Sequence, residues 1–240
     1  MKRELQEDNQ ITKKPKHEII LSVNGTSPRE LDQFFTKPDV AKVCVYQLNN
    51  VLTNGLSKVD LVLEPSFGDG AFVKALQNIG ITSKLKFVDI DASEETYRAD
   101  FLKDTIVPKS YFHPKKGFSC VTVGNPPFGK NSSLAVSFFN HAAKFSVCIA
   151  FIVPRTFSKK SLQSKLDRNF FLVHEMVLEE DGFLFKNESY DVPCVFQVWV
   201  HSEYGNIIKS EILKIAPMQI PSKNPKLRLL ETKITKTPAF

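Results

Sequence analysis

Apolar segments of strand length alternate with helix-like stretches through most of this sequence, and that alternation leaves few folds open. We predict strands at 60–64, 84–90, 118–124, 147–153, 172–178 and 195–201, and helices at 38–48, 71–79, 132–145 and 159–168. Strands that alternate with helices build a parallel sheet covered by helices on both faces. The last two strands are joined by 179–191, which shows no clear helix, so we expect the final strand to insert antiparallel at the edge.

The length of 240 residues, with 42% hydrophobic and 24% charged residues, is typical of one folded domain with tails. Residues 1–27 are polar and contain Lys13-Lys14-Pro15-Lys16, which predicts a flexible arm, although the basic run also suits a nuclear address. Residues 216–240 contain five Lys or Arg against one acid, Glu231, and are read as a basic tail or a loosely attached strand. The domain is therefore expected to span 28–215.

Several classes of protein are excluded by what the sequence lacks. No apolar run reaches the about 20 residues of a membrane span, and the first residues lack the apolar stretch of a signal peptide. We therefore expect an intracellular protein without a membrane partner, in the cytoplasm or the nucleus. The four cysteines are far apart, and neither cysteines nor histidines have zinc-ligand spacing, so no structural metal is expected. The net charge of +6 (32 − 26) either aids solubility or suits a polyanionic partner.

A glycine-rich turn follows the first predicted strand. The segment reads Leu-Val-Leu-Glu-Pro-Ser-Phe-Gly-Asp-Gly over 61–70, a buried strand that breaks into a tight turn before a helix. In an open α/β sheet such a turn lies where ligands bind, and Gly68 and Gly70 let a ligand approach the backbone. A purely structural turn is the alternative. About twenty residues further on, Asp89 ends the next strand, where a carboxylate bonds ribose hydroxyls or, alternatively, caps a turn.

The third strand runs into Asn125-Pro126-Pro127-Phe128. Two prolines give the chain a rigid path out of the sheet, because they fix φ and donate no ladder hydrogen bond. The Asn125 side-chain oxygen and the Pro126 carbonyl are acceptors for the two hydrogens of an exocyclic amine, and the Phe128 ring offers a surface for a flat base. Accepting both hydrogens frees the nitrogen lone pair to attack an activated methyl group.

Together, four motifs resemble the class I S-adenosylmethionine-dependent methyltransferases that modify adenine N6. They are Phe-Thr-Lys-Pro at 35–38, Glu-Pro-Ser-Phe-Gly-Asp-Gly-Ala-Phe at 64–72, Val-Asp-Ile-Asp at 88–91 and Asn-Pro-Pro-Phe at 125–128. The resemblance covers about residues 30–200 and implies a Rossmann-like α/β fold. The sequence departs from the family by inserting Lys37 between Thr36 and Pro38, and by leaving only eight residues between Asp91 and Asp100.

The resemblance assigns roles to individual positions. It implies that the methionine end of S-adenosylmethionine is held by Phe35, Thr36, Glu64, Pro65, Ser66, Gly68 and Gly70. It implies that Asp89 bonds the ribose, and that Asp100 with Phe101 meets the adenine of the cofactor. The target base is then gripped by the catalytic segment Asn125, Pro126, Pro127 and Phe128.

The predicted function is therefore methyl transfer to adenine N6 in nucleic acid, with DNA and RNA both open. Only 39 residues follow the last predicted strand, fewer than the about 100 of a separate recognition domain, so a partner subunit is one candidate source of target choice. Two alternatives stay open. One is methylation of a protein glutamine amide, which poses the same chemical problem, and the other is a non-catalytic nucleic-acid-binding module on this fold.

Overall fold

The computed structural model describes residues 34–82, 84–108, 118–178, 183–185, 188–190 and 193–209. The predicted arm at 1–27 and the predicted basic tail at 216–240 lie outside these residues.

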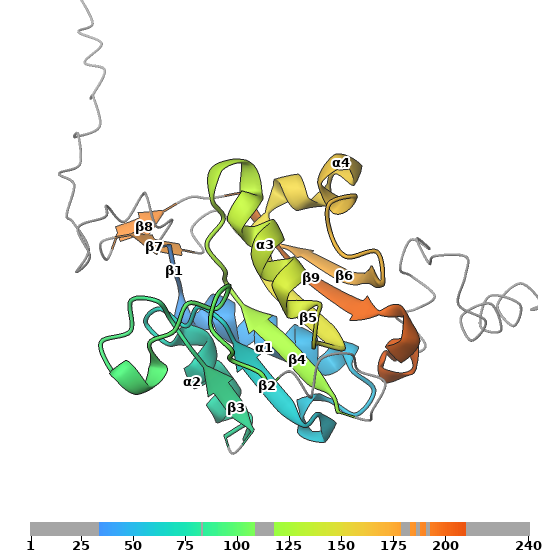
Figure 1. The fold of residues 1–240 in the computed structure, drawn as a ribbon, viewed down its shortest axis with the longest axis horizontal. Helices are drawn as coiled ribbons and strands as arrows, with labels where there is room; N and C mark the ends of the chain where they lie inside the picture. The colour runs from blue at the N-terminus through green and yellow to red at the C-terminus, as the bar shows by residue number, and fades with distance from the viewer. Residues whose placement is uncertain are drawn as a thin grey trace, which may run out of the picture.

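Six strands form the central sheet (Figure 1). Their spatial order is β3 (Leu85–Phe87), β2 (Leu61–Glu64), β4 (Cys120–Gly124), β5 (Cys148–Pro154), β9 (Cys194–His201) and β6 (Phe170–Val177). The pairs β2–β3, β2–β4 and β4–β5 are parallel, and β9 is antiparallel to both β5 and β6. The predicted α/β class with a mostly parallel sheet is confirmed. The antiparallel strand lies one position inside the edge, which is formed by β6.

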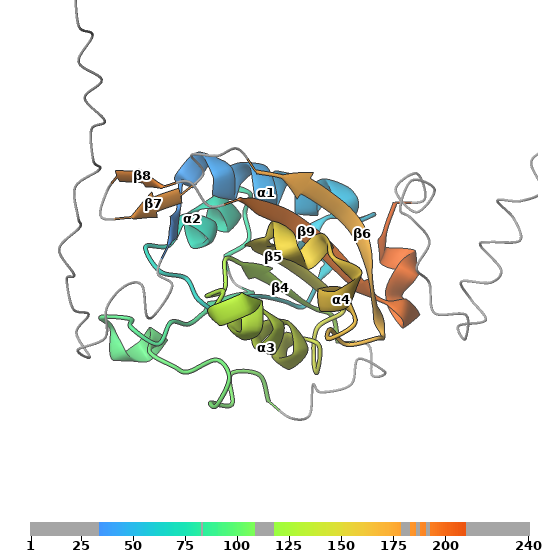
Figure 2. The same cartoon turned by 90° about the horizontal axis from the view of Figure 1, so that it is seen from above.

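Helices cover both faces of this sheet (Figure 2). The helices α1 (Pro38–Val51) and α2 (Ala71–Asn78) pack on one face, and α3 (Ser133–Ala142) and α4 (Lys160–Gln163) pack on the other. Alternate strand residues serve the two cores: Val62 belongs to the first and Leu63 to the second. Because β4 and β5 are buried on both faces, they read as continuous apolar runs in the sequence.

The helix predicted at 159–168 is shorter in the structure. It ends at Gln163, and the Asn140 side chain then bonds the backbone that follows. Its Nδ2 donates to the Lys165 carbonyl (2.9 Å) and its Oδ1 accepts from the Asp167 N–H (2.8 Å). A side chain from α3 thus satisfies backbone groups that a longer helix would have paired internally.

A second, small sheet has the order β1-β7-β8 and is antiparallel. It consists of β1 (Phe35–Thr36), β7 (Phe183–Phe185) and β8 (Glu188–Tyr190), and it lies near the start of α2 (Figure 1). Phe183 is fully buried in the core under α1 and α2. Short 3-10 turns complete the described chain: Leu56–Lys58, Glu95–Tyr97, Lys130–Ser132, Arg155–Ser158 and Ser202–Ile207.

Candidate active site

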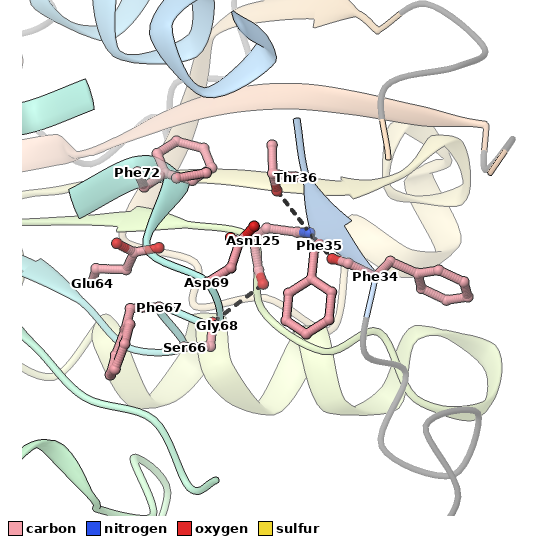
Figure 3. Close-up of a pocket in the computed structure, with 11 residues that line it drawn as sticks. Phe34, Phe35, Thr36, Glu64, Ser66, Phe67, Gly68, Asp69, Phe72 and Asn125 are labelled. Carbon is pink, nitrogen blue, oxygen red and sulfur yellow. Dashed lines mark hydrogen bonds between the residues drawn. The ribbon is translucent and has the colours of Figure 1, made fainter. Parts of the chain in front are cut away.

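A pocket opens at the carboxyl ends of β2 and β4. Three separate segments line it: β1 with the residue before it, the turn between β2 and α2, and Asn125 after β4 (Figure 3). Among the predicted site residues, the pocket brings together Phe35, Thr36, Glu64, Ser66, Gly68 and Asn125. The motifs around 35, 64 and 125 therefore meet at one place, as the sequence predicts.

The two glycines of the first turn are required by the backbone. Gly68 has φ of +53° and Gly70 has φ of +82°, values in the left-handed region. A Cβ on Gly68 would lie 3.1 Å from the Phe35 ring, so glycine also allows β1 to approach the turn. Gly70 is the N-cap of α2, and its N–H donates to the Phe67 carbonyl at 2.8 Å.

Glu64 is a buried carboxyl group at the base of the pocket, with 1% of its surface exposed. Its Oε2 has no hydrogen-bond partner among the described residues. Burial raises the pKa of Glu64 well above its usual value, and the negative charges of Asp89 and Asp69 raise it further, against the opposing effect of a hydrogen bond from the Val73 N–H. The carboxyl group at the bottom of the pocket therefore holds its proton more tightly than an exposed glutamate does.

Asn125 is fixed by three hydrogen bonds (Figure 3). Its Nδ2 donates to the Phe34 carbonyl (3.0 Å) and to the Thr36 hydroxyl (3.1 Å), and its main-chain carbonyl accepts from the Ser66 hydroxyl (3.2 Å). The side-chain Oδ1 is buried and has no partner among the described residues. Because both donors of the amide are engaged by β1 and its neighbour, the one free acceptor is the oxygen that lies in the pocket.

The rest of the Asn-Pro-Pro-Phe segment turns back onto α3. Pro126 is buried and Pro127 is half-buried. The Phe128 carbonyl accepts from the N–H groups of Leu134 and Ala135 at 3.1 and 3.2 Å, which ties the segment to the first turn of α3. The Phe128 ring is 8% exposed and belongs to the core under α1 and α2. Its face is not open to a base, which differs from the predicted stacking surface.

Asp89 holds the glycine turn in place. Its Oδ2 accepts from the Gly68 N–H and its Oδ1 from the Asp91 N–H, both at 2.9 Å. This is the turn-capping role that the sequence left as the alternative. A carboxylate oxygen has two lone pairs, so these bonds leave acceptor capacity, and ribose binding by Asp89 stays a prediction.

Asp100 and Phe101 do not line the pocket. Asp100 forms an ion pair with Lys103 at 2.9 Å and accepts from the Leu102 N–H, and these partners lower its pKa against the opposing effect of desolvation. Phe101 is 2% exposed and packs on Phe138 and other rings of the second core. No strand forms between 91 and 100 in the described chain, so β3 is the edge of the sheet on this side.

Five residues that are not among the predicted site residues also line the pocket: Phe34, Phe67, Asp69, Ala71 and Phe72. Four of them lie inside the motif at 64–72, so the motif could have indicated them. Nothing in the sequence indicates the role of the Phe34 carbonyl, since every residue type has a main-chain carbonyl.

Comparisons with known proteins concern the fold. The sequence matches no protein-family model and no curated protein. A chain of the DrdV–DNA complex is similar in structure, with a TM-score of 0.50, 13% identity, and coverage of 72% of this chain and 27% of that one. The fold is that of the class I methyltransferases.

Solved methyltransferase structures are also similar. They include a type I restriction-modification system methyltransferase subunit from Streptococcus thermophilus, with a TM-score of 0.48, 15% identity, and coverage of 70% of this chain and 45% of that one. The 23S rRNA methyltransferase ErmE has a TM-score of 0.45, 15% identity, and coverage of 70% of both chains. The chain thus spans about a quarter to two thirds of these proteins.

Two further observations concern the described residues only. None of their helices is long and apolar enough to cross a membrane. Their His, Cys, Asp and Glu side chains form no group of three that could hold a metal ion. The four cysteines are all free and buried, and burial raises the pKa of Cys120 to about 12.

Proposed function

We propose that this chain is an S-adenosylmethionine-dependent methyltransferase that methylates the N6 amine of adenine in DNA or RNA. One observation carries the proposal. The Asn125 Oδ1 is a buried, unpartnered acceptor, oriented by two hydrogen bonds from its own amide nitrogen, in the pocket that also contains the glycine turn. An oriented acceptor of this kind suits a donor group of a ligand, and an aromatic amine is such a group.

The pocket also fits the positively charged cofactor. Glu64 Oε2 has no partner among the described residues, and Asp69 adds an acceptor in the same pocket, so this part of the pocket is suited to an ammonium or sulfonium group. Glu64, Asp69 and the turn at Gly68 would hold the methionine end. The bound cofactor would supply a methyl group on a positively charged sulfur.

The residues of the chain act on the amine. Asn125 Oδ1 and the Pro126 carbonyl accept the two amine hydrogens, which withdraws the nitrogen lone pair from the ring and directs it at the methyl carbon. The bound cofactor would give its methyl group to this lone pair as its carbon–sulfur bond breaks, and the methylated amine would lose one proton to solvent. Acceptors that strengthen as positive charge develops on nitrogen lower the barrier selectively, and no covalent enzyme intermediate is needed.

The substrate class is tested by incubating the purified chain and methyl-labelled S-adenosylmethionine with total DNA, total RNA and a protein extract. The proposal expects label in one nucleic-acid fraction, recovered as N6-methyladenine after hydrolysis. Label confined to protein would support the glutamine alternative. A failure to bind S-adenosylhomocysteine in calorimetry would contradict the methyltransferase assignment itself.

Thr36 should act as a positioning residue for Asn125. In Thr36→Val the side chain keeps its shape but loses the acceptor for Asn125 Nδ2, so the amide is held by the Phe34 carbonyl alone. Losing one hydrogen bond of about 1–1.5 kcal/mol should lower kcat about five- to tenfold. Steady-state kinetics should show KM and cofactor affinity unchanged.

Thr36→Ser is the matched control, because it restores the hydroxyl and should restore kcat. If Thr36→Val instead weakened cofactor binding with kcat intact, Thr36 would act on the cofactor, as the family resemblance implies.

A further inference from the structure

The charges around the pocket are divided by sign. No Asp or Glu occurs between Asp104 and Asp167. The described part of that stretch carries only positive charges, at Lys130, Lys144, Arg155, Lys159, Lys160 and Lys165. The loop after β2 and the first part of the segment after β3 carry acids instead, at Asp69, Asp89, Asp91, Glu94 and Glu95, before Arg98 and Lys103 follow. One side of the pocket therefore suits a cation, and the other side suits an anion.

Four of these cations follow β4, the strand that leads to Asn125, or β5, its parallel neighbour. Lys130 follows the Asn-Pro-Pro-Phe segment after β4, and Arg155 directly follows β5, the neighbouring parallel strand. A hydrogen bond of 3.0 Å between the hydroxyls of Ser132 and Thr156 joins the two loops, so they lie side by side. We call Lys130, Arg155, Lys159 and Lys160 the basic edge; it runs from the start of α3 to α4 (Figure 1).

The charges of the basic edge are not neutralised locally. All four side chains are exposed, and none forms an ion pair with another described residue. Glu175 lies beside the edge, but it accepts hydrogen bonds from the Ser158 hydroxyl and the Gln197 amide. The backbone below the edge is fixed, since the Arg155 N–H donates to the Pro193 carbonyl at 3.0 Å. The backbone that carries Arg155 is thus held in place by the fold.

We propose that the basic edge binds the phosphate backbone of the nucleic-acid strand whose base enters the pocket at Asn125. This inference rests on the proposed function and adds to it the surface that holds the substrate. Lys130 follows the same strand as Asn125, and Arg155 follows its parallel neighbour, so a strand whose base enters the pocket would pass along these cations. Such contacts hold the strand in place and read no sequence, so binding should depend on salt and hardly on sequence.

The test measures the affinity of the full chain for labelled random-sequence oligonucleotides, single-stranded and duplex, across a range of salt concentrations. In Lys130→Gln/Arg155→Gln, each lost phosphate contact should reduce the slope of log affinity against log salt by about 0.7–0.9. Lys58→Gln/Lys74→Gln is the matched control, because it removes the same charge from exposed lysines outside the basic edge. The control should keep the wild-type slope, and both variants should keep the wild-type melting temperature and affinity for S-adenosylhomocysteine.

Three results would overturn the inference. The first is an unchanged salt slope in Lys130→Gln/Arg155→Gln, and the second is an equal loss of slope in the control. The third is displacement of the oligonucleotide by poly-glutamate at equal charge concentration, which would indicate a surface for acidic protein. Failure of the proposed function is distinguishable: the wild-type chain would then bind oligonucleotides through the basic edge but transfer no methyl group to any nucleic acid.

Discussion

Replacing Asn125 by alanine is expected to lower kcat for methyl transfer about 100- to 1,000-fold, the usual cost of removing one preorganised polar group from a transition state. The loss should fall on kcat because Asn125 Oδ1 bonds the amine most strongly as positive charge develops on it. Cofactor affinity should be preserved, since Glu64 ends β2 and the glycine turn follows it, whereas Asn125 follows β4. Single-turnover kinetics with the substrate identified by the labelling experiment measures the effect.

Asn50→Ala is a matched control for this variant, because it makes the same change at the far end of α1, away from the pocket. Circular dichroism and S-adenosylhomocysteine titration establish that both variants are folded. A folded, cofactor-binding Asn125→Ala protein that turned over at the wild-type rate would show that the amine is held elsewhere.

Glu64→Gln should weaken cofactor binding by about 2–5 kcal/mol, the cost of removing one partner of a buried charge pair. This corresponds to at least about a thirtyfold rise in Kd. Glutamine has the same shape as the glutamic acid side chain, so the fold should be preserved. Glu203→Gln, an exposed position, is the control and should leave Kd unchanged. Calorimetry with S-adenosylhomocysteine measures both, and equal Kd values would remove Glu64 from the site.

The same variant should change how stability depends on pH. Burial raises the pKa of Glu64 above its ordinary value of 4.5, so above that pH the unfolded chain has released a proton that the folded chain retains. The contribution of Glu64 to stability is therefore complete below pH 4.5 and is lost as pH rises toward its folded pKa. Glutamine has no such proton. The melting temperature of Glu64→Gln relative to wild type should rise between pH 5 and pH 8, both without ligand.

How much of the fold could be predicted from the sequence depends on how many consecutive residues each hydrophobic pattern covers. The strands β4 and β5 were predicted within two residues at each end, because burial on both faces gives continuous apolar runs. The strands β1, β7 and β8 were missed, since two or three residues are too few to show a period of two.

The site shows the same division. The motifs predicted that Thr36, Glu64 and Asn125 share a pocket, because each follows or precedes a recognisable element. They did not predict that Thr36 bonds Asn125, or that Phe128 faces the core. Those two results depend on side-chain directions set by tertiary packing, which residue type and spacing leave open.

The pairing of β1 with β7 has a consequence for the order of folding. Phe35 pairs with Leu184, and Thr36 pairs with Phe183, so contacts between distant parts of the chain hold the segment that orients Asn125. Closing so long a loop costs conformational entropy before the contacts of the paired strands can offset that cost. Contacts of this kind therefore form late. The sheet and helices can therefore assemble before the pocket does, and the wall formed by β1 is completed by the second half of the chain.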